Sequence, residues 1–429
     1  MERLKDKTFS VNTFGCRTNQ YEAEAITFAL EEAGAVYKEE EPDILIVVSC
    51  TITEAAERKC RKLIRKRLRE RSSTLVVVCG CYAQKINEKE RKKIGIDILV
   101  GSRMKHRLPD ILADYFEFPE RSTHYLLSEE SLLKEKSWDL LKLDKPHHRT
   151  RAFLKVQDGC NHFCSYCVVP YVRGYPVSRN LAETVEEAAK IVESGCNEIV
   201  LTGVHLGLYE ELDVLVRRIG EIPGLKRLRF GSIEPFAITD ELLKALVETE
   251  VFCPHLHLPL QSGDDKVLKM MRRGYNTDGY RKIVEKIRNI FGDRLHISTD
   301  LMLGFPSEDD RAFKNSMNFL NEIEFGKVHV FPYSRRPGTK AAELPLISQD
   351  IIRERKGEAL SLSRELLKKY CLKCIGEQTS ILVEEKKTAL ISGLTPTFIR
   401  LYKKDNSENI LDIVEVTPRE YKNGALYAD

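Results

Sequence analysis

The chain has 429 residues, of which 68 are Lys or Arg and 65 are Asp or Glu, so its formal net charge at neutral pH is only +3. This length allows two or three domains with separate cores, and the near balance of charge means that a polyanion would have to bind at a local basic patch. No apolar run approaches the ~20 residues of a membrane helix, and no signal-peptide pattern is visible, so we expect a cytoplasmic protein. In that reducing compartment, the 12 cysteines favour metal ligands or reactive thiols over disulfides.

Three apolar runs near the N-terminus each end in a cysteine. TFSVNTFGC, DILIVVSC and TLVVVCGC lead to Cys16, Cys50 and Cys81, with helical segments between them. This alternation is typical of an open parallel α/β sheet, in which the residues after successive strands meet at one edge. We therefore expect the three thiols to converge on an iron-sulfur cluster that keeps one iron open. Cys79 is the alternative ligand in the third run, but Gly80 frees Cys81 at the turn, so Cys81 is preferred.

The segment between the second and third runs predicts a strongly basic helix. Residues 58–71, RKCRKLIRKRLRER, are mostly Arg and Lys outside an apolar stripe that contains Cys60. Such a surface suits phosphate groups, although a merely solvated charged face explains the charge equally well. Cys60 is expected to be buried as a small hydrophobic side chain.

A denser group of cysteines follows a linker that we expect at residues 119–145. In DGCNHFCSYCVVPYVRG, residues 158–174, Cys160, Cys164 and Cys167 form a CxxxCxxC array after the strand-like run AFLKVQ. A structural zinc site would normally take four protein ligands, whereas a cluster held by three thiolates keeps one iron free for a substrate. The array resembles the signature of the radical S-adenosylmethionine (SAM) enzymes. A zinc knuckle and three incidental cysteines are the alternatives.

Six β-rich runs alternate with helical stretches from this point on. They lie at residues 152–157, 198–203, 227–232, 255–260, 295–303 and 328–333. The alternation predicts a parallel sheet covered by helices, and radical SAM enzymes have a partial (β/α)6 barrel of this kind. Because chemistry in such barrels gathers at the carboxyl ends of the strands, the cysteine array lies where a cofactor would be held.

Residues at the other strand ends are candidates for binding cofactor and substrate. Glycines there allow a close backbone approach, and carboxylate or amide groups can bond to ribose hydroxyls or to an amino-acid group. The candidates for SAM are Thr202, Gly203, Ser232, Glu234, Gln261 and Gly304. Surface or SAM-binding roles are the alternative for each of the substrate candidates, which are Arg173, Arg179, His205, Arg335 and Arg336.

After about residue 375 the sequence pattern changes from alternating helices and strands to short β-rich runs separated by Gly, Pro and Asn turns. We expect a small β-barrel at residues 374–429. It resembles the TRAM module that binds RNA, with Phe398 where that module often has a tyrosine, so stacking on a base would be retained. Cys371 and Cys374 form a CxxC with no second pair nearby, and we expect them to be structural.

Motifs over nearly the whole chain resemble the methylthiotransferases. FGCRTNQYEAE, SCTITEAAERK and GCYAQ are similar to the N-terminal domain of that family, and GCNHFCSYCVVPYVRG, LTGVHLG, HLPLQSG and FPYSRRPGT to its radical SAM domain. Two of these motifs, GCRTNQYE and LTGVHLG, most resemble the branch that acts on N6-threonylcarbamoyladenosine beside the tRNA anticodon. The branches that act on isopentenyladenosine and on a ribosomal-protein aspartate are the alternatives.

The resemblance implies three domains and two four-iron, four-sulfur clusters. The domains would be an open parallel α/β sheet domain at 1–118, a radical SAM barrel at 146–373 and the TRAM-like β-barrel at 374–429. The cluster on the CxxxCxxC array would bind SAM and, once reduced, cleave it to a 5′-deoxyadenosyl radical. The cluster on the three N-terminal cysteines would hold the sulfur that becomes the methylthio group, which a second SAM methylates.

The resemblance also implies the partners. They would be the anticodon stem-loop of a tRNA and an electron donor such as flavodoxin or ferredoxin, with neither DNA nor a membrane involved. A protein of a different class, a non-catalytic iron-sulfur protein that binds RNA or senses redox state, is the alternative to a transferase. Cleavage of SAM would separate the two classes.

Overall fold

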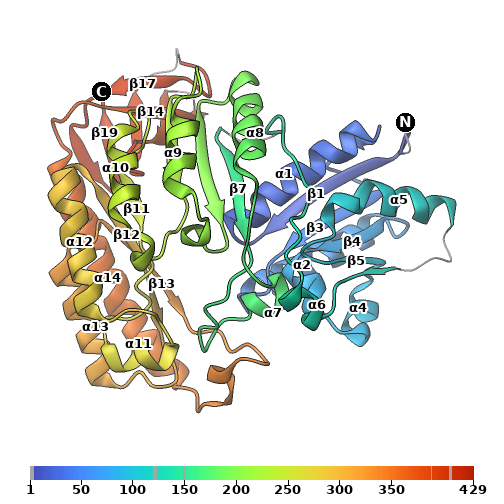
Figure 1. Cartoon of the computed structure of the whole chain (residues 1–429), viewed down its shortest axis with the longest axis horizontal. Helices are drawn as coiled ribbons and strands as arrows, with labels where there is room; N and C mark the ends of the chain where they lie inside the picture. Colours follow the sequence, from blue (N-terminus) through green and yellow to red (C-terminus); the bar gives the residue numbers. More distant parts are fainter. Residues whose placement is uncertain (1–3, 119–122, 148–149, 388, 405–407) are drawn as a thin grey trace.

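The computed structural model describes residues 4–118, 123–147, 150–387, 389–404 and 408–429. They form an N-terminal α/β domain, a central open barrel and a C-terminal β module (Figure 1). This is the α/β architecture that the sequence predicts. No helix in the described part of the chain is long and apolar enough to cross a membrane.

The N-terminal domain contains a parallel six-stranded sheet with the order β2-β1-β3-β4-β5-β6. The strands are β1 (Thr8–Phe14), β2 (Val36–Tyr37), β3 (Ile44–Ser49), β4 (Leu75–Cys79), β5 (Ile98–Val100) and β6 (His124–Tyr125). Its helices are α1 (Arg17–Glu32), α2 (Glu54–Glu70), α3 (Cys81–Lys85), α4 (Glu88–Ile94) and α5 (Leu108–Glu117). Alternate residues of β3 point to opposite faces, so that Ile46 packs in the core with α1 and α5, and Val47 in the core with α2, α3 and α4.

The segment expected to be a linker is folded in its described part, and this corrects the prediction. Residues 119–122 lie outside the described residues, but β6 joins the N-terminal sheet beside β5, and α6 (Glu129–Lys134) buries Leu132. Asp139 and Leu141, further along, are also buried. A two-residue strand and a six-residue helix are too short to show a hydrophobic period, which is why the sequence pattern does not reveal them.

The barrel strands run in chain order, and each predicted β-rich run overlaps one of them. They are β7 (Ala152–Asp158), β9 (Glu198–Gly203), β10 (Arg227–Phe230), β11 (His255–His257), β12 (His296–Leu303) and β13 (Lys327–Pro332). The hydrogen-bonded neighbours among them pair in parallel, and isolated bridges such as Ser232 to His257 connect β10 with β11. A short strand, β8 (Val177–Ser178), pairs antiparallel with β7 at the open edge.

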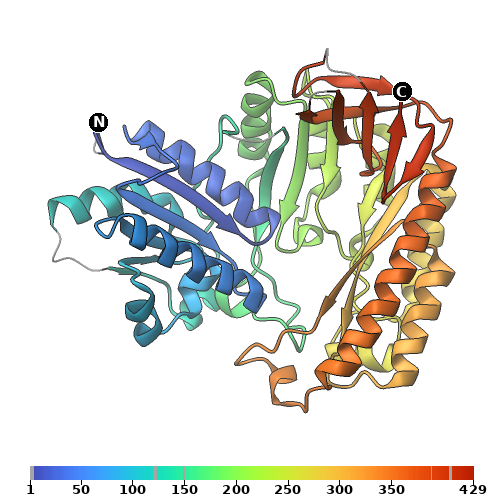
Figure 2. The same ribbon diagram turned by 180° about the vertical axis from the view of Figure 1, so that it is seen from behind.

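Helices cover the outside of the barrel, as Figures 1 and 2 show. They are α8 (Leu181–Glu193), α9 (Leu212–Gly220), α10 (Asp240–Glu248), α11 (Asp265–Met271), α12 (Thr277–Phe291), α13 (Asp310–Ile323) and α14 (Gln349–Lys373). The short helix α7 (Val169–Arg173) instead packs against α3 and α6. Single 3-10 turns occur at Lys105–Arg107, Leu206–Leu208, Pro235–Ala237, Gly292–Arg294 and Lys340–Glu343. The last helix, α14, runs along the barrel and leads into the C-terminal module (Figure 2).

The C-terminal module is a curled six-stranded sheet with the order β17-β14-β15-β16-β19-β18. Its strands are β14 (Thr379–Lys387), β15 (Leu390–Leu394), β16 (Arg400–Lys404), β17 (Ile413–Val416), β18 (Glu420–Lys422) and β19 (Ala425–Ala428). It packs on the amino ends of the barrel strands. The guanidinium of Arg227, the first residue of β10, donates to the carbonyl of Leu394 at 2.8 Å, and the ring of His296, the first residue of β12, donates to the carbonyl of Thr397 at 2.6 Å.

Phe398 does not offer a free face for stacking on a base, which corrects the expectation from the sequence. Its ring stacks on His255 with centroids 4.8 Å apart. The guanidinium groups of Arg229 and Arg17 lie 4.9 and 5.6 Å from its centroid. The loop that carries Phe398 therefore fixes the C-terminal module to the barrel.

Candidate functional site

A cavity of about 390 Å³ lies at the carboxyl ends of the barrel strands and opens toward the N-terminal domain. Cys160, Cys164 and Cys167 line it from the loop after β7, while Cys16 lines it from the start of α1. Ile52 and Thr53, which precede α2, complete the wall on the N-terminal side. The CxxxCxxC array and one member of the N-terminal set, Cys16, thus line one cavity.

The backbone of the CxxxCxxC loop is tightly constrained. Gly159 has φ +74°, and a Cβ atom there would stand 2.1 Å from the carbonyl oxygen of Tyr175, so only glycine fits. The next amide, that of Cys160, donates to the carbonyl of Gly174 at 3.0 Å. The amide of Val169 points at the sulfur of Cys167 at 3.4 Å. This arrangement holds the loop at the cavity and directs a backbone donor at one of its sulfurs.

The three N-terminal cysteines come together at one edge of the sheet. Cys16 caps α1, Cys50 follows β3, and Cys81 is the first residue of α3. The thiol of Cys50 is hydrogen-bonded to Cys81, and a Cβ atom on Gly15 would stand only 2.6 Å from the Cβ of Cys50. The sheet geometry therefore produces the convergence that parallel strands predict.

Two other cysteines of this domain face away from that edge. Cys79 is fully buried in the core formed with α1 and α5, and Cys60 is fully buried beneath α2, as expected for a small hydrophobic residue. Cys81 rather than Cys79 therefore lies beside Cys50. In the described part of the chain, no three His, Cys, Asp or Glu side chains are arranged around a single metal ion. A cubane binds each thiolate to a different iron, so it accepts more widely spaced sulfurs than one ion does.

The pKa of Cys81 is lowered, whereas burial raises the pKa of Cys16 and the hydrogen bond to Cys81 raises the pKa of Cys50 in the same set. The hydrogen bond from Cys50 lowers the pKa of Cys81 to about 6 against the effect of burial, and the guanidinium of Arg173 lowers it further. Burial raises the pKa of Cys160 to about 11 and that of Cys167 to about 12. The latter thiols would release protons when a metal binds them.

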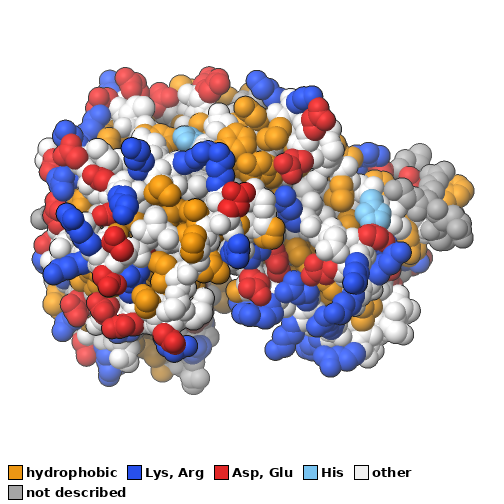
Figure 3. All heavy atoms as spheres, turned by 90° about the horizontal axis from the view of Figure 1, so that it is seen from below, with side chains coloured by type: hydrophobic (Ala, Val, Ile, Leu, Met, Phe, Trp, Pro, Cys, Tyr) orange, Lys and Arg blue, Asp and Glu red, His pale blue; other side chains and the backbone are white. Residues whose placement is uncertain are grey.

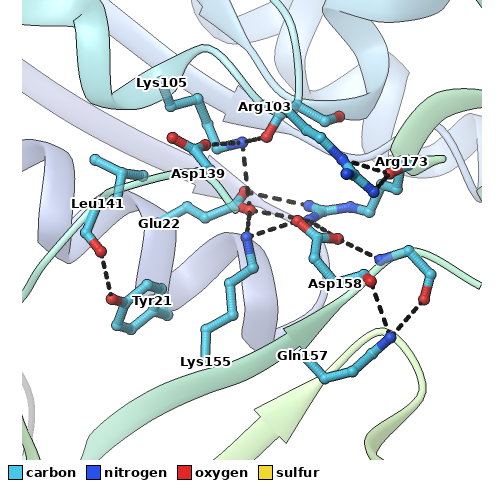
Figure 4. A network of polar contacts seen from close by, with 12 residues as sticks. Tyr21, Glu22, Arg103, Lys105, Asp139, Leu141, Lys155, Gln157, Asp158 and Arg173 are labelled. Atoms are coloured by element: carbon cyan, nitrogen blue, oxygen red, sulfur yellow. Dashed lines mark hydrogen bonds and ion pairs between the residues drawn. The ribbon is translucent and has the colours of Figure 1, made fainter. Parts of the chain in front are cut away.

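A buried network of charges joins the N-terminal domain to the barrel next to Cys81 (Figure 4). Arg173 lies at its centre, with its guanidinium 2.9 Å from Glu22 of α1 and 3.1 Å from Asp158 of β7. Its Nε donates to the sulfur of Cys81 at 3.1 Å. Lys155 bridges the same two carboxylates at 2.9 and 2.6 Å. Burial alone would raise the pKa of Glu22, but these cations lower it, so the carboxylate stays charged.

Two of the predicted substrate arginines are therefore used inside the protein, which corrects those predictions. Arg173 is only 1% exposed and is held by Glu22 and Asp158. Arg179 is 3% exposed and pairs with Glu187 at 2.5 Å. Neither side chain lines the cavity. Sequence spacing near the mouth of the barrel does not reveal burial, because the acidic partners lie on other elements.

Of the other three substrate candidates, two line the cavity and one lies outside it. His205 lines the cavity, stacks on His162 with centroids 4.7 Å apart, and has a pKa that burial lowers to about 4, so the ring is neutral at pH 7. Arg336 also lines the cavity, and its guanidinium lies 2.8 Å from Glu57 of α2. Arg335 is exposed outside it and donates to the carbonyl of Ala342 at 2.7 Å.

Half of the SAM candidates line the cavity. Ser232, Glu234 and Gln261 do so, and the buried Oε1 of Gln261 has no hydrogen-bond partner among the described residues. This orphaned acceptor points to a missing polar ligand. The others, which do not line it, are Thr202, Gly203 and Gly304. The strand-end rule locates the correct edge of the barrel but does not say which side chains turn inward.

Two arginines at the cavity are not among the residues predicted from the sequence. Arg273 pairs with Glu234, and its NH1 lies 3.5 Å from the sulfur of Cys164. Arg272 precedes it in a left-handed conformation with φ +58°, and its exposed side chain also lines the cavity. Both follow the short helix α11 rather than a strand, so a search of strand ends passes over them. The sequence MRRGY, with paired arginines before a glycine, is the signal that identifies this turn.

Comparisons with known proteins agree with this geometry. Residues 154–320 match the radical SAM superfamily, and residues 8–101 match an uncharacterized protein family, UPF0004. A threonylcarbamoyladenosine tRNA methylthiotransferase of Bacillus subtilis is 34% identical to this chain, over 95% of this chain and 93% of its own length. The chain belongs to the radical SAM tRNA methylthiotransferase family.

The relatives of this methylthiotransferase differ in the base that their names specify. A tRNA-2-methylthio-N(6)-dimethylallyladenosine synthase of Syntrophotalea carbinolica is 35% identical over 88% of each chain. Overall identity therefore does not distinguish the two substrates. Among solved structures, the radical SAM methyltransferase TsrM from Kitasatospora setae matches with a TM-score of 0.60 at 15% identity, covering 79% of this chain and 77% of that one. That similarity supports the fold.

Proposed function

We propose that this methylthiotransferase converts N6-threonylcarbamoyladenosine beside the tRNA anticodon into its 2-methylthio derivative. The observation that carries the proposal is the single cavity lined by Cys160, Cys164 and Cys167 and by Cys16, the exposed member of the N-terminal set. An enzyme that joins sulfur to an unactivated carbon must bring a radical source and a sulfur source to the same substrate atom. One cavity between two cluster sites meets that requirement.

In this proposal, each cysteine set holds a four-iron, four-sulfur cluster. The ligands would be Cys160, Cys164 and Cys167 for one cluster, and Cys16, Cys50 and Cys81 for the other. When bound, the clusters supply reductive SAM cleavage and the transferred sulfur, with electrons from a donor such as flavodoxin or ferredoxin. The protein contributes binding, orientation and exclusion of water.

The residues around the cavity fit SAM as the ligand of the first site. Gln261 offers its unpartnered Oε1 to the amino group of SAM, and Ser232 offers a hydroxyl. Glu234 is held in place by Arg273, which also approaches Cys164. This ion pair would hold the cysteine loop in a fixed position relative to the residues that bind SAM.

The charge at the cavity favours threonylcarbamoyladenosine over isopentenyladenosine. The threonylcarbamoyl group ends in a carboxylate, whereas the isopentenyl group is apolar. Arg272 lines the cavity, is exposed, and has no acidic partner within 4.0 Å among the described residues. Arg336 is nearby but is already paired with Glu57. We therefore assign recognition of the substrate carboxylate to Arg272, with Arg336 beside it. A hydrogen bond to a charged group contributes about 1.5–3 kcal/mol, or roughly tenfold to a hundredfold in affinity.

Anticodon stem-loops test the proposal directly. The anaerobically reconstituted enzyme is incubated with SAM, a chemical reductant and stem-loops that carry threonylcarbamoyladenosine, isopentenyladenosine or plain adenosine, and the methylthio mass shift is measured. We expect the first substrate to react and the second to react at least roughly tenfold more slowly. Arg272→Gln should reduce this preference, whereas Arg335→Gln, at an exposed arginine outside the cavity, should not. Equal or faster modification of the isopentenyl substrate would refute the substrate assignment.

A further inference from the structure

A groove of about 500 Å³ on the outside of α2 is lined almost entirely by basic side chains. They are Arg58, Arg61, Lys62, Arg65 and Arg69, with Leu68 as the one apolar member. Figure 3 shows Lys and Arg side chains gathered in one region of the N-terminal half on the face that it displays. The concentration is notable in a chain whose overall charge is nearly balanced.

Four of these cations form a continuous stripe on one helical face, which we call the α2 stripe: Arg58, Lys62, Arg65 and Arg69. Their spacing of four, three and four residues follows the helical period. All four are exposed, and none forms an ion pair within the described residues. The neighbouring cations on the same helix do have acidic partners: Arg61 pairs with Glu90, and Arg67 with Glu70.

The α2 stripe contributes little to the fold. The core side of α2 is provided by Cys60 and Ile64, which are fully buried, while the stripe faces outward. Like charges three or four residues apart destabilise a helix by about 0.2–0.5 kcal/mol per pair, and the stripe contains three such neighbouring pairs. An anionic partner would remove this repulsion. The arrangement therefore fits binding better than it fits stability.

The position of α2 connects the stripe to the reactive cavity. Thr53, which caps α2, and Ile52 both line the cavity, and Glu57 in the first turn pairs with the cavity residue Arg336. From Arg58 to Arg69 the helix rises about 16 Å, a length over which one nucleic-acid strand presents four or five phosphates. A backbone that leaves the cavity at Thr53 would therefore meet successive cations of the stripe.

The C-terminal module does not occupy this position. It is bound to the amino ends of the barrel strands through Arg227 and His296, whereas the cavity lies at their carboxyl ends. Figure 1 shows the module at the top of the barrel and α2 lower down, in the N-terminal domain. The module is therefore remote from the RNA backbone nearest to the reacting adenine.

We propose that the α2 stripe binds the sugar-phosphate backbone of the substrate RNA where that backbone leaves the cavity. This inference rests on the proposed RNA substrate and adds the surface that positions it. Contacts to phosphate carry no base information, so the stripe sets affinity and orientation, while the cavity selects the modified adenine.

The test replaces all four stripe cations with glutamine: Arg58→Gln, Lys62→Gln, Arg65→Gln and Arg69→Gln. A matched control removes four exposed cations from α14, on the far side of the barrel: Lys356→Gln, Arg364→Gln, Lys368→Gln and Lys373→Gln. Binding of the reconstituted proteins to the threonylcarbamoyladenosine stem-loop is measured at several salt concentrations. SAM cleavage without RNA serves as the check that the cavity is intact.

We expect the stripe variant to bind the stem-loop at least ~10-fold more weakly and its salt dependence, the slope of log K against log salt, to fall by about 3. KM for the RNA should rise by the same factor, with kcat and RNA-independent SAM cleavage unchanged. The α14 variant should match the wild type in slope. Equal loss in both variants, or no loss in the stripe variant, would overturn the inference and leave the proposed function standing. Failure of the wild-type protein to bind or modify any stem-loop would overturn both.

Discussion

Replacing Arg173 with methionine removes the central cation of the buried network while keeping an apolar side chain of similar length. Glu22 and Asp158 are both almost completely buried, and each would lose an ion pair, at 2.9 and 3.1 Å respectively. Removing one partner of a buried ion pair lowers the free energy of unfolding by about 3–5 kcal/mol. Lys155 stays within 3 Å of both carboxylates, so we expect the lower end of this range, about 3 kcal/mol, as a shift in urea unfolding.

Arg173→Met should also weaken the iron-sulfur site that we propose on the N-terminal cysteines, because the guanidinium donates to the sulfur of Cys81. Loss of a donor that supports a metal ligand typically costs about 10–100-fold in metal affinity. The assay is the rate of iron loss to a chelator from the reconstituted protein. Arg179→Met is the matched control, because it also removes a buried arginine from a carboxylate, that of Glu187, but makes no contact with a cysteine.

The reasoning predicts that both variants are destabilised and that only Arg173→Met releases the iron of one cluster faster. Equal rates of iron loss from the two variants would show that general destabilisation, not the contact to Cys81, governs the site. Unchanged urea unfolding in Arg173→Met would refute the energetic role of the network itself.

Three further predictions concern other parts of the molecule. Cys160→Ala should abolish reductive SAM cleavage, whereas Cys16→Ala should keep cleavage measurable and lose methylthiolation, and iron analysis should find about one cluster missing from each. Gly159→Ala, whose new Cβ would stand 2.1 Å from the carbonyl of Tyr175, should lose the iron of the CxxxCxxC site in the same analysis, and full iron content would contradict the loop geometry. Burial lowers the pKa of His296 to about 4, below the ordinary value of 6.5, so the unfolded chain takes up a proton that the folded one does not. The contribution of His296 to stability should therefore decrease by about 1 kcal/mol between pH 6.5 and pH 5.5. His296→Asn should lack this increment in urea unfolding at the two pH values, and an identical pH dependence would refute it.

The parts of the fold that the sequence predicts are those with a strong local pattern. Strands β3 and β4 are fully buried apolar runs, and the convergence of Cys16, Cys50 and Cys81 follows because β1, β3 and β4 are neighbours in a parallel sheet. The rule that places chemistry at the carboxyl ends of barrel strands predicts the edge at which the cavity lies. The CxxxCxxC array lies at that cavity for the same reason.

The parts that the sequence does not predict depend on partners far away in the chain. Arg173 looks available for a substrate until Glu22, 151 residues earlier, is found against it. Phe398 looks like a base-stacking residue until the C-terminal module is seen docked on His255. Arg272 follows the short helix α11, and only the folded barrel brings its side chain to the wall of the cavity. Tertiary packing decides each of these cases, and no local pattern reports it.

The most direct test of the central claim is nucleoside mass spectrometry of tRNA from cells with and without the gene. The account predicts that 2-methylthio-N6-threonylcarbamoyladenosine disappears and its unmethylthiolated precursor accumulates when the gene is deleted. The wild-type gene should restore the product, and the Cys160→Ala gene should not. An unchanged level of this nucleoside, together with loss of the 2-methylthio form of isopentenyladenosine, would contradict the account.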